Sequence, residues 1–112
     1  MTENKLADMS TEFAVKILNL TDGIKGHYSL ANQLERSGTS IGANIREAFY
    51  AHGKADFIAK LQIALKECSE TEYWIELILE SEYYHDKTLL DKCIEIKKIL
   101  IASLNTAKEN KQ

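Results

Sequence analysis

Apolar side chains recur along the chain at steps of three and four residues, the spacing that places them on one side of an α-helix. In the first segment this stripe consists of Met9, Phe13, Ile17, Leu20 and Ile24. Three further segments repeat the pattern and are separated by short stretches without it. The pattern predicts four helices, over residues 6–25, 29–52, 56–81 and 87–108.

Residues that start or stop helices mark the expected boundaries. Gly26 and Gly53 follow the first two segments, where glycine commonly ends a helix. Ser29 is expected to cap the second helix through its side-chain oxygen, and Asp56 stands at the entry to the third. Connections this short make successive helices antiparallel. The predicted fold is therefore all-α, an antiparallel up-down-up-down four-helix bundle.

Composition agrees with an all-α fold in one domain. The 112 residues include no proline and five glycines, and 45% of them are apolar. Such a composition suits long uninterrupted helices and is poor in turn-forming residues. A chain of this length forms one core, so we expect residues 1–112 to be a single domain.

The third segment carries apolar side chains on more than one side. Besides its main stripe it has a second set, which lies largely on the other side and consists of Ile63, Tyr73, Trp74 and Leu77. A helix of a monomeric bundle needs only one apolar stripe. Burying an aromatic side chain is worth a few kcal/mol at about 25 cal/mol per Å². The second set therefore predicts a contact between copies of the chain; the alternative is that Trp74 packs within its own subunit.

Small and polar residues interrupt the stripe of the second segment. Weak helix formers such as Ser37, Gly38 and Gly42 need a reason there, and close approach of a neighbouring helix is one. On the third segment Glu72 falls on an apolar stripe, where a carboxylate needs hydrogen-bond partners. We expect a buried polar layer that fixes the register of the helices, formed by Ser40, Asn44, Glu47, Ser69 and Glu72, with Thr71 as a further partner.

The sequence carries no motif for nucleophilic catalysis, zinc binding or phosphate binding. His27, His52 and His85 all fall at predicted helix ends, without the spacing of metal ligands. The alternative to a structural polar layer is an active site built from Asn44, Glu47, Glu67 and Glu72. Catalytic carboxylates need a cleft and a second titrating group. We therefore expect no enzyme activity, no metal and no cofactor.

Two features favour a cytoplasmic protein. Charges at Glu3, Lys5 and Asp8 interrupt any candidate signal-peptide core, and no apolar run is long enough to span a membrane. Cys68 and Cys93 lie far apart without a CxxC pair, as is typical of reduced and buried thiols. The expected location is the cytoplasm, with no membrane attachment.

Two segments resemble the family of 23S ribosomal RNA intervening-sequence proteins. The first is RSGTSIGANIREA, residues 36–48, and the second is ALKECSETEYWIEL, residues 64–77. The resemblance implies an antiparallel four-helix bundle that assembles as a ring, typically a homopentamer, with no catalytic activity assigned. Related accessory proteins of diversity-generating retroelements form similar rings and bind nucleic acid through basic surfaces. Ala48 stands where the family often has glycine.

The charge of the chain argues mildly against nucleic acid, because the formal net charge is −3 at pH 7 whereas nucleic-acid binders usually have a basic surplus. Basic residues nevertheless gather in the last segment, and repetition around a ring would concentrate Lys87, Lys92, Lys97 and Lys98. The sequence thus predicts a non-enzymatic homo-oligomer that acts as a scaffold or interaction module. A nucleic-acid-binding accessory protein is the alternative.

Overall fold

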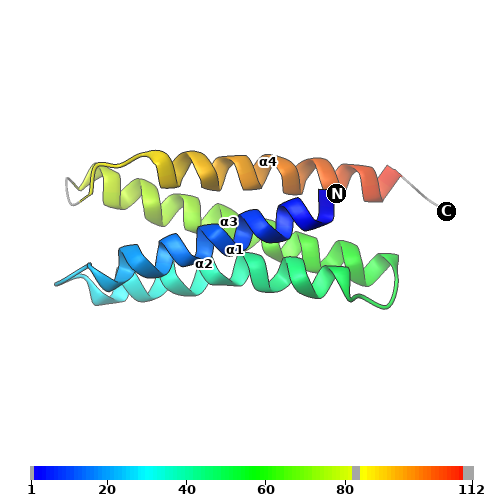
Figure 1. The fold of residues 1–112 in the computed structure, drawn as a ribbon, viewed down its shortest axis with the longest axis horizontal. Coiled ribbons are helices and arrows are strands. Elements are labelled where there is room, and N and C mark those ends of the chain that lie inside the picture. Colours follow the sequence, from blue (N-terminus) through cyan, green and yellow to red (C-terminus); the bar gives the residue numbers. More distant parts are fainter. Residues whose placement is uncertain (1, 82–83, 110–112) are drawn as a thin grey trace.

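The structure is a computed structural model that describes residues 2–81 and 84–109. Residues 1, 82–83 and 110–112, and the side chains of residues 2–4, lie outside the described part. Within it are four helices: α1 (Thr2–Asp22), α2 (Tyr28–Phe49), α3 (Lys54–Glu80) and α4 (Thr88–Glu109). Each runs antiparallel to the one before it in a single elongated bundle of 50 × 20 × 20 Å (Figure 1). The predicted all-α bundle is confirmed.

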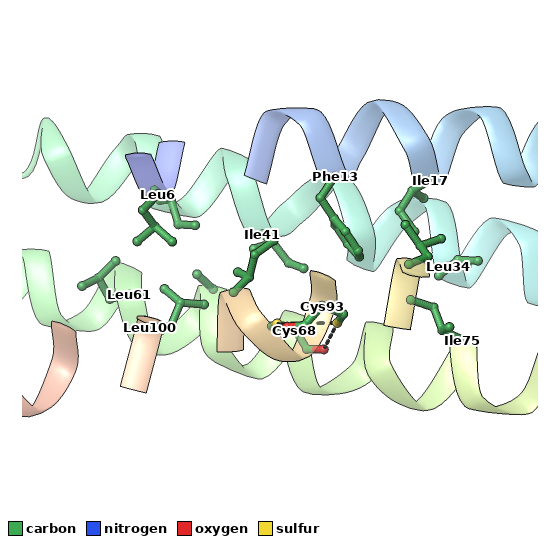
Figure 2. Close-up of a cluster of buried hydrophobic side chains, with 14 of the residues drawn as sticks. Leu6, Phe13, Ile17, Leu34, Ile41, Leu61, Cys68, Ile75, Cys93 and Leu100 are labelled. Atoms are coloured by element: carbon green, nitrogen blue, oxygen red, sulfur yellow. Dashed lines mark hydrogen bonds between the residues drawn. The ribbon is translucent and has the colours of Figure 1, made fainter. Parts of the chain in front are cut away.

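Each helix turns one apolar stripe towards a common core along the axis of the bundle. The predicted stripe of α4 is buried along its whole length, at Leu89, Cys93, Ile96, Leu100 and Leu104. Figure 2 shows side chains of α1 and α2, among them Phe13 and Ile41, meeting side chains of α3 and α4. Burial of these stripes is the main force that holds the four helices together.

The helix boundaries differ from the predicted ones by a few residues. Ser29 is not the cap of α2, because the helix begins one residue earlier and the His27 carbonyl already accepts a bond from the Ala31 N–H at 3.0 Å. Gly26, with φ of 88°, lies in the turn after α1. At the start of α3 the Gly53 carbonyl accepts from the Phe57 N–H at 2.9 Å. Local capping preferences are weak, and packing moves a boundary by a turn or less.

The first turn of α4 is fixed by an aspartate in the connection before it. The carboxylate oxygen Oδ1 of Asp86 accepts hydrogen bonds from the backbone N–H of Thr88 at 2.9 Å and from its hydroxyl at 2.8 Å. These bonds to the charged form hold the pKa of Asp86 below its usual value. Residues 82 and 83 of the connection between α3 and α4 lie outside the described residues.

Glycines of α2 allow α1 to approach closely. A Cβ atom on Gly38 would lie 3.0 Å from Cγ1 of Ile17, and one on Gly42 would lie 3.2 Å from Oγ of Ser10. Ordinary carbon–carbon contacts are about 3.5–4.0 Å, so a side chain at Gly38 would press into the core. This agrees with the expectation that small residues of the second helix make room for a neighbour.

Candidate interaction surface

The side of α3 that faces away from the core exposes three large apolar side chains. Ile63 is 41% exposed, Tyr73 is 53% exposed and Leu77 is 37% exposed. Ten and fourteen residues after Ile63, at about 100° per residue, Tyr73 and Leu77 fall within roughly 80° of it around the helix. Ala59, also exposed, continues the same stripe. We call these four residues the α3 stripe.

Trp74 does not belong to this exposed set. Its side chain is partly buried and packs against the core, and its ring lies 5.2 Å from that of Tyr73. Trp74 follows Glu67 by seven residues, and Glu67 pairs with Arg36 of α2, so the indole lies on the side of α3 next to α2. Its own subunit therefore covers Trp74 in part. Its buried Nε1 has no hydrogen-bond partner among the described residues.

A second apolar surface is an open groove at the end of the bundle where α2 gives way to α3. The groove measures about 800 Å³ and is bordered by Phe49 of α2, Phe57 of α3 and Ile99 of α4. Small residues such as Ala102 and Ala107 form its α4 wall. Phe57 lies on a different side of α3 from the stripe, so the groove and the stripe are two separate surfaces.

The polar contact buried between α2 and α3 is formed by Ser37 and by Thr71, which was predicted as a further partner of the polar layer. Oγ1 of Thr71 lies 2.8 Å from Oγ of Ser37 and 2.8 Å from the carbonyl oxygen of Glu67. The Ser37 hydroxyl is in turn 3.4 Å from the carbonyl oxygen of Leu34. Both side chains are fully buried. This pair can fix the register between α2 and α3, because shifting it would leave buried hydroxyls unpaired.

The five residues of the predicted layer do not meet. The Asn44 amide donates to the Ser40 carbonyl at 2.9 Å, and the Ser40 hydroxyl donates to the Arg36 carbonyl at 2.7 Å. Both side chains thus bond back to their own helix, as short polar side chains commonly do. Ser69 is exposed. The predicted buried layer is therefore wrong, because these residues lie beside the α2–α3 contact and not in it.

The two acidic members of that layer form ion pairs at the edges of the bundle. Glu47 pairs with Lys60 of α3 at 3.0 Å, and its side chain is 57% exposed. Glu72 pairs with Lys97 of α4 at 2.6 Å, and this pair is largely covered. The hydrogen bond from Lys97 to Glu72 raises the pKa of Lys97. Glu47 and Glu72 thus reach different neighbours, and the described residues do not assemble the alternative active site.

Arg36 links the two segments on which the family resemblance rests. Its guanidinium contacts Glu67 at 3.3 Å and Glu70 at 3.0 Å, both on α3. Its pKa is raised, first by the hydrogen bond to Glu70 and then by the charge of Glu67. Next to it lies the buried pair of Ser37 and Thr71. Residues 36–48 and 64–77 therefore carry the α2–α3 contact, which gives them a structural role.

The lysines predicted for nucleic acid do not form one free basic surface. Lys97 is held by Glu72, and Lys92 lies 3.5 Å from Glu95 of its own helix. Lys87 and Lys98 are exposed. Carboxylates of the same chain thus offset two of the four predicted charges, which weakens the electrostatic attraction of phosphate that such a surface would need.

The two cysteines are buried, as expected, but the structure adds that they face each other. Sγ of Cys68 lies 3.7 Å from Sγ of Cys93, and both thiols are free. Their mutual hydrogen bonding, together with burial, raises the pKa of Cys93. The sequence gives no sign of this juxtaposition, because the two residues are 25 positions apart on different helices.

Nowhere in residues 2–81 and 84–109 do three or more histidine, cysteine, aspartate or glutamate side chains converge as metal ligands would. Among the same residues, no helix combines the length and apolar character that crossing a bilayer requires.

The fold places this chain in the class of antiparallel four-helix bundles, here with polar contacts that join α2 to α3. Residues 2–102 match the family described as 23S rRNA-intervening sequence protein, so the chain belongs to this family. It is similar to a protein with unknown function from the S23 ribosomal protein family of Bacteroides thetaiotaomicron, whose crystal structure has been determined at 1.70 Å. The two are 46% identical with a TM-score of 0.87, covering 94% of this chain and 99% of that chain. No curated protein matches this chain.

The family expected from residues 36–48 and 64–77 is thereby confirmed. Neither the family description nor that of the Bacteroides protein states a catalytic activity.

Proposed function

We propose that this chain is the non-enzymatic subunit of a cytoplasmic homo-oligomeric scaffold, with the α3 stripe as one contact surface between copies. The observation that carries the proposal is the exposure of Ile63, Tyr73 and Leu77 on a helix whose opposite side already fills the core. Apolar side chains gathered on one exposed face commonly mark a surface that binds a partner. The cytoplasmic location is supported by the two free thiols.

The energy available from the α3 stripe is considerable but not sufficient alone. Complete burial of a large apolar side chain is worth about 1.5–3 kcal/mol, so covering the exposed parts of these three would contribute roughly 2–4 kcal/mol per copy. A stable interface of standard size buries about 800 Å² per partner, which requires more surface than three side chains provide. Glu70, which lies between Ile63 and Leu77 on the same side of α3 and pairs with Arg36, would form the polar part of this contact.

A closed ring of more than two copies needs two different complementary surfaces on each subunit. The α3 stripe is an exposed row of apolar side chains interrupted by Lys66 and Glu70, and the groove beside Phe49, Phe57 and Ile99 is an apolar hollow on another side. The proposed ring places the α3 stripe of one copy against the groove of the next. The proposed number of copies is five, which rests on the family resemblance.

The test is the mass of the purified chain by light scattering coupled to size exclusion at micromolar concentration. The expected mass is a multiple of 12.7 kDa, fivefold for a pentamer. Leu77→Arg in the α3 stripe and Ala102→Arg in the groove should each release monomers, because either substitution places a charge in an apolar contact. The matched control is Leu18→Arg, since Leu18 is 44% exposed on α1, outside both surfaces.

Three results would count against the proposal: a monomeric wild type, a Leu77→Arg variant that keeps the wild-type mass, or a Leu18→Arg variant that loses it equally. Far-ultraviolet circular dichroism of each variant separates loss of assembly from loss of helix. The alternative role, binding of RNA or DNA, is tested in the same run by nucleic acid absorbance that elutes with the protein. Because Lys92 and Lys97 are paired with carboxylates, we expect none.

A further inference from the structure

The contact between α3 and α4 contains a facing pair of thiols. Sγ of Cys68 lies 3.4 Å from the carbonyl oxygen of Cys93, and Sγ of Cys93 lies 3.5 Å from the carbonyl oxygen of Cys68. The two sulfur atoms are 3.7 Å apart, and neither residue is exposed (Figure 2). This reciprocal arrangement places the two residues directly opposite each other between the helices. A disulfide bond of about 2.05 Å would need the sulfur atoms to approach by less than 2 Å, roughly what side-chain rotation provides.

An ion pair lies beside the thiols. Glu72 follows Cys68 by four residues and Lys97 follows Cys93 by four, so each charged residue shares a helix face with one cysteine. Side chains of a helix lean towards its N-terminus, so both lean back towards the level of the thiols. There they meet at 2.6 Å, with 18% and 29% of their side chains exposed. Glu72 and Lys97 both act electrostatically on Cys93, as expected for groups this close.

We propose that Cys68 and Cys93 form a redox modification site, in which a small peroxide converts the two thiols into an intramolecular disulfide that joins α3 to α4. The Glu72–Lys97 ion pair restricts access of the oxidant to this site. This inference concerns the single subunit and does not depend on assembly into a ring.

The reaction balances with hydrogen peroxide as the oxidant. One thiol attacks a peroxide oxygen, the O–O bond breaks, and a sulfenic acid and one water molecule form. The second thiol then attacks the sulfenic sulfur, the S–S bond forms, and a second water molecule leaves. Two thiols are oxidised and one peroxide is reduced, and a small dithiol reverses the change. Because Cys68 and Cys93 face each other, the sulfenic acid has its resolving thiol in contact.

Burial explains why the site responds slowly in the closed bundle. The thiolate is the reactive form, and the hydrogen bond with Cys68, together with burial, raises the pKa of Cys93 and so keeps the thiol of Cys93 protonated. Opening the ion pair admits water and peroxide and so speeds the first step. Once formed, the disulfide closes a loop from residue 68 to residue 93, which restricts the unfolded chain and so stabilises α3 and α4 against unfolding.

The experiment treats the full-length chain with hydrogen peroxide and follows free thiols and intact mass. We expect the chain to lose both thiols and two hydrogen atoms without forming a covalent dimer, and peptide mapping should find any added oxygen on methionine and none on Cys68 or Cys93. The midpoint of thermal unfolding should rise and return to its starting value with dithiothreitol. Cys68→Ser should show no rise. The proposal is overturned if the folded chain keeps both thiols, or gains oxygen on Cys68 or Cys93, under peroxide that forms the disulfide once urea has unfolded the chain.

Variants of the ion pair test access separately. Lys97→Met should speed disulfide formation several-fold, and Glu72→Gln, which retains a hydrogen-bonding side chain, should speed it less. Lys92→Met is the matched control, since Lys92 pairs with Glu95 on the same helix in an exposed position. Its rate should equal that of the wild type. Equal rates for Lys97→Met and Lys92→Met would refute the role of the ion pair, and thermal unfolding of each variant identifies any general loss of stability.

Discussion

Gly38 lies where Ile17 of α1 packs directly on the backbone of α2. A Cβ atom added at Gly38 would lie 3.0 Å from Cγ1, 3.1 Å from Cγ2 and 3.4 Å from Cβ of Ile17. Both residues are buried. The branched side chain of isoleucine is stiff close to the backbone, so these atoms cannot turn aside as the end of a flexible side chain would. Gly38→Ala therefore has two opposing effects on the free energy of unfolding: alanine favours the helix, but its methyl group disturbs the packing against Ile17.

The magnitudes decide the sign of the effect. Alanine is favoured over glycine inside a helix by about 1 kcal/mol. Forcing an extra methyl group into a packed core costs typically about 1–3 kcal/mol. We expect Gly38→Ala to lower the free energy of unfolding by about 1 kcal/mol. The same substitution of glycine by alanine at an exposed position inside a helix would raise the free energy of unfolding by about 1 kcal/mol.

A double-mutant cycle with Ile17 isolates the contact. Ile17→Ala removes Cγ1 and Cγ2, so in that background Gly38→Ala should stabilise the protein by about 1 kcal/mol. Ile17→Val retains two branch carbons, so in that background Gly38→Ala should remain destabilising. Urea unfolding followed by circular dichroism at one fixed protein concentration measures all the variants. The packing argument fails if Gly38→Ala has the same effect with alanine as with isoleucine at position 17.

Two further predictions concern hydrogen bonds. Thr71→Val should lower the free energy of unfolding by about 1 kcal/mol because it removes the hydrogen bond to Ser37. Ser37→Ala should destabilise the Thr71→Val variant less than it destabilises the wild type, because the bond is already absent. Strictly additive losses in urea unfolding would contradict the pairing. The hydrogen bonds from Thr88 hold the pKa of Asp86 below its ordinary value of 3.8. These bonds therefore stabilise the folded state at pH values above 3.8, and the stabilisation is lost as the pH falls through the pKa of Asp86 in the folded state. The unfolding midpoint of Asp86→Ala should therefore lie below that of the wild type at neutral pH and approach it in acid, and a gap independent of pH would contradict this reasoning.

The errors in the predicted site have a common geometric cause. Ser40 and Asn44 share a broad helical face with Ser37, but only Ser37 reaches Thr71, because packing fixes how α2 is rotated about its axis. Periodicity places residues relative to one another on a helix but not relative to the next helix. The same limit applies to Trp74, which is partly buried because its position on α3 lies on the side next to α2.

Long-range partners of charged and thiol side chains could not be predicted either. The sequence predicts Lys97 on a basic surface, but its long side chain reaches Glu72 on the neighbouring helix. Cys68 and Cys93 were expected to be buried, which composition suggests, but not to face each other. Contacts of this kind depend on the axial level at which two helices cross, and the stripes of the helices tolerate more than one such level.

The sequence by itself determined the number of helices, their antiparallel order, the buried stripes and the family, because each follows from short-range periodicity, short connections or contiguous motifs. Tertiary structure alone decided the rotation and axial level of each helix, and with them the pairing of Ser37 with Thr71, of Glu72 with Lys97 and of Cys68 with Cys93. Apolar stripes bind without direction, so many alignments bury similar area. The observed one is selected by close packing at Gly38 and by directional hydrogen bonds.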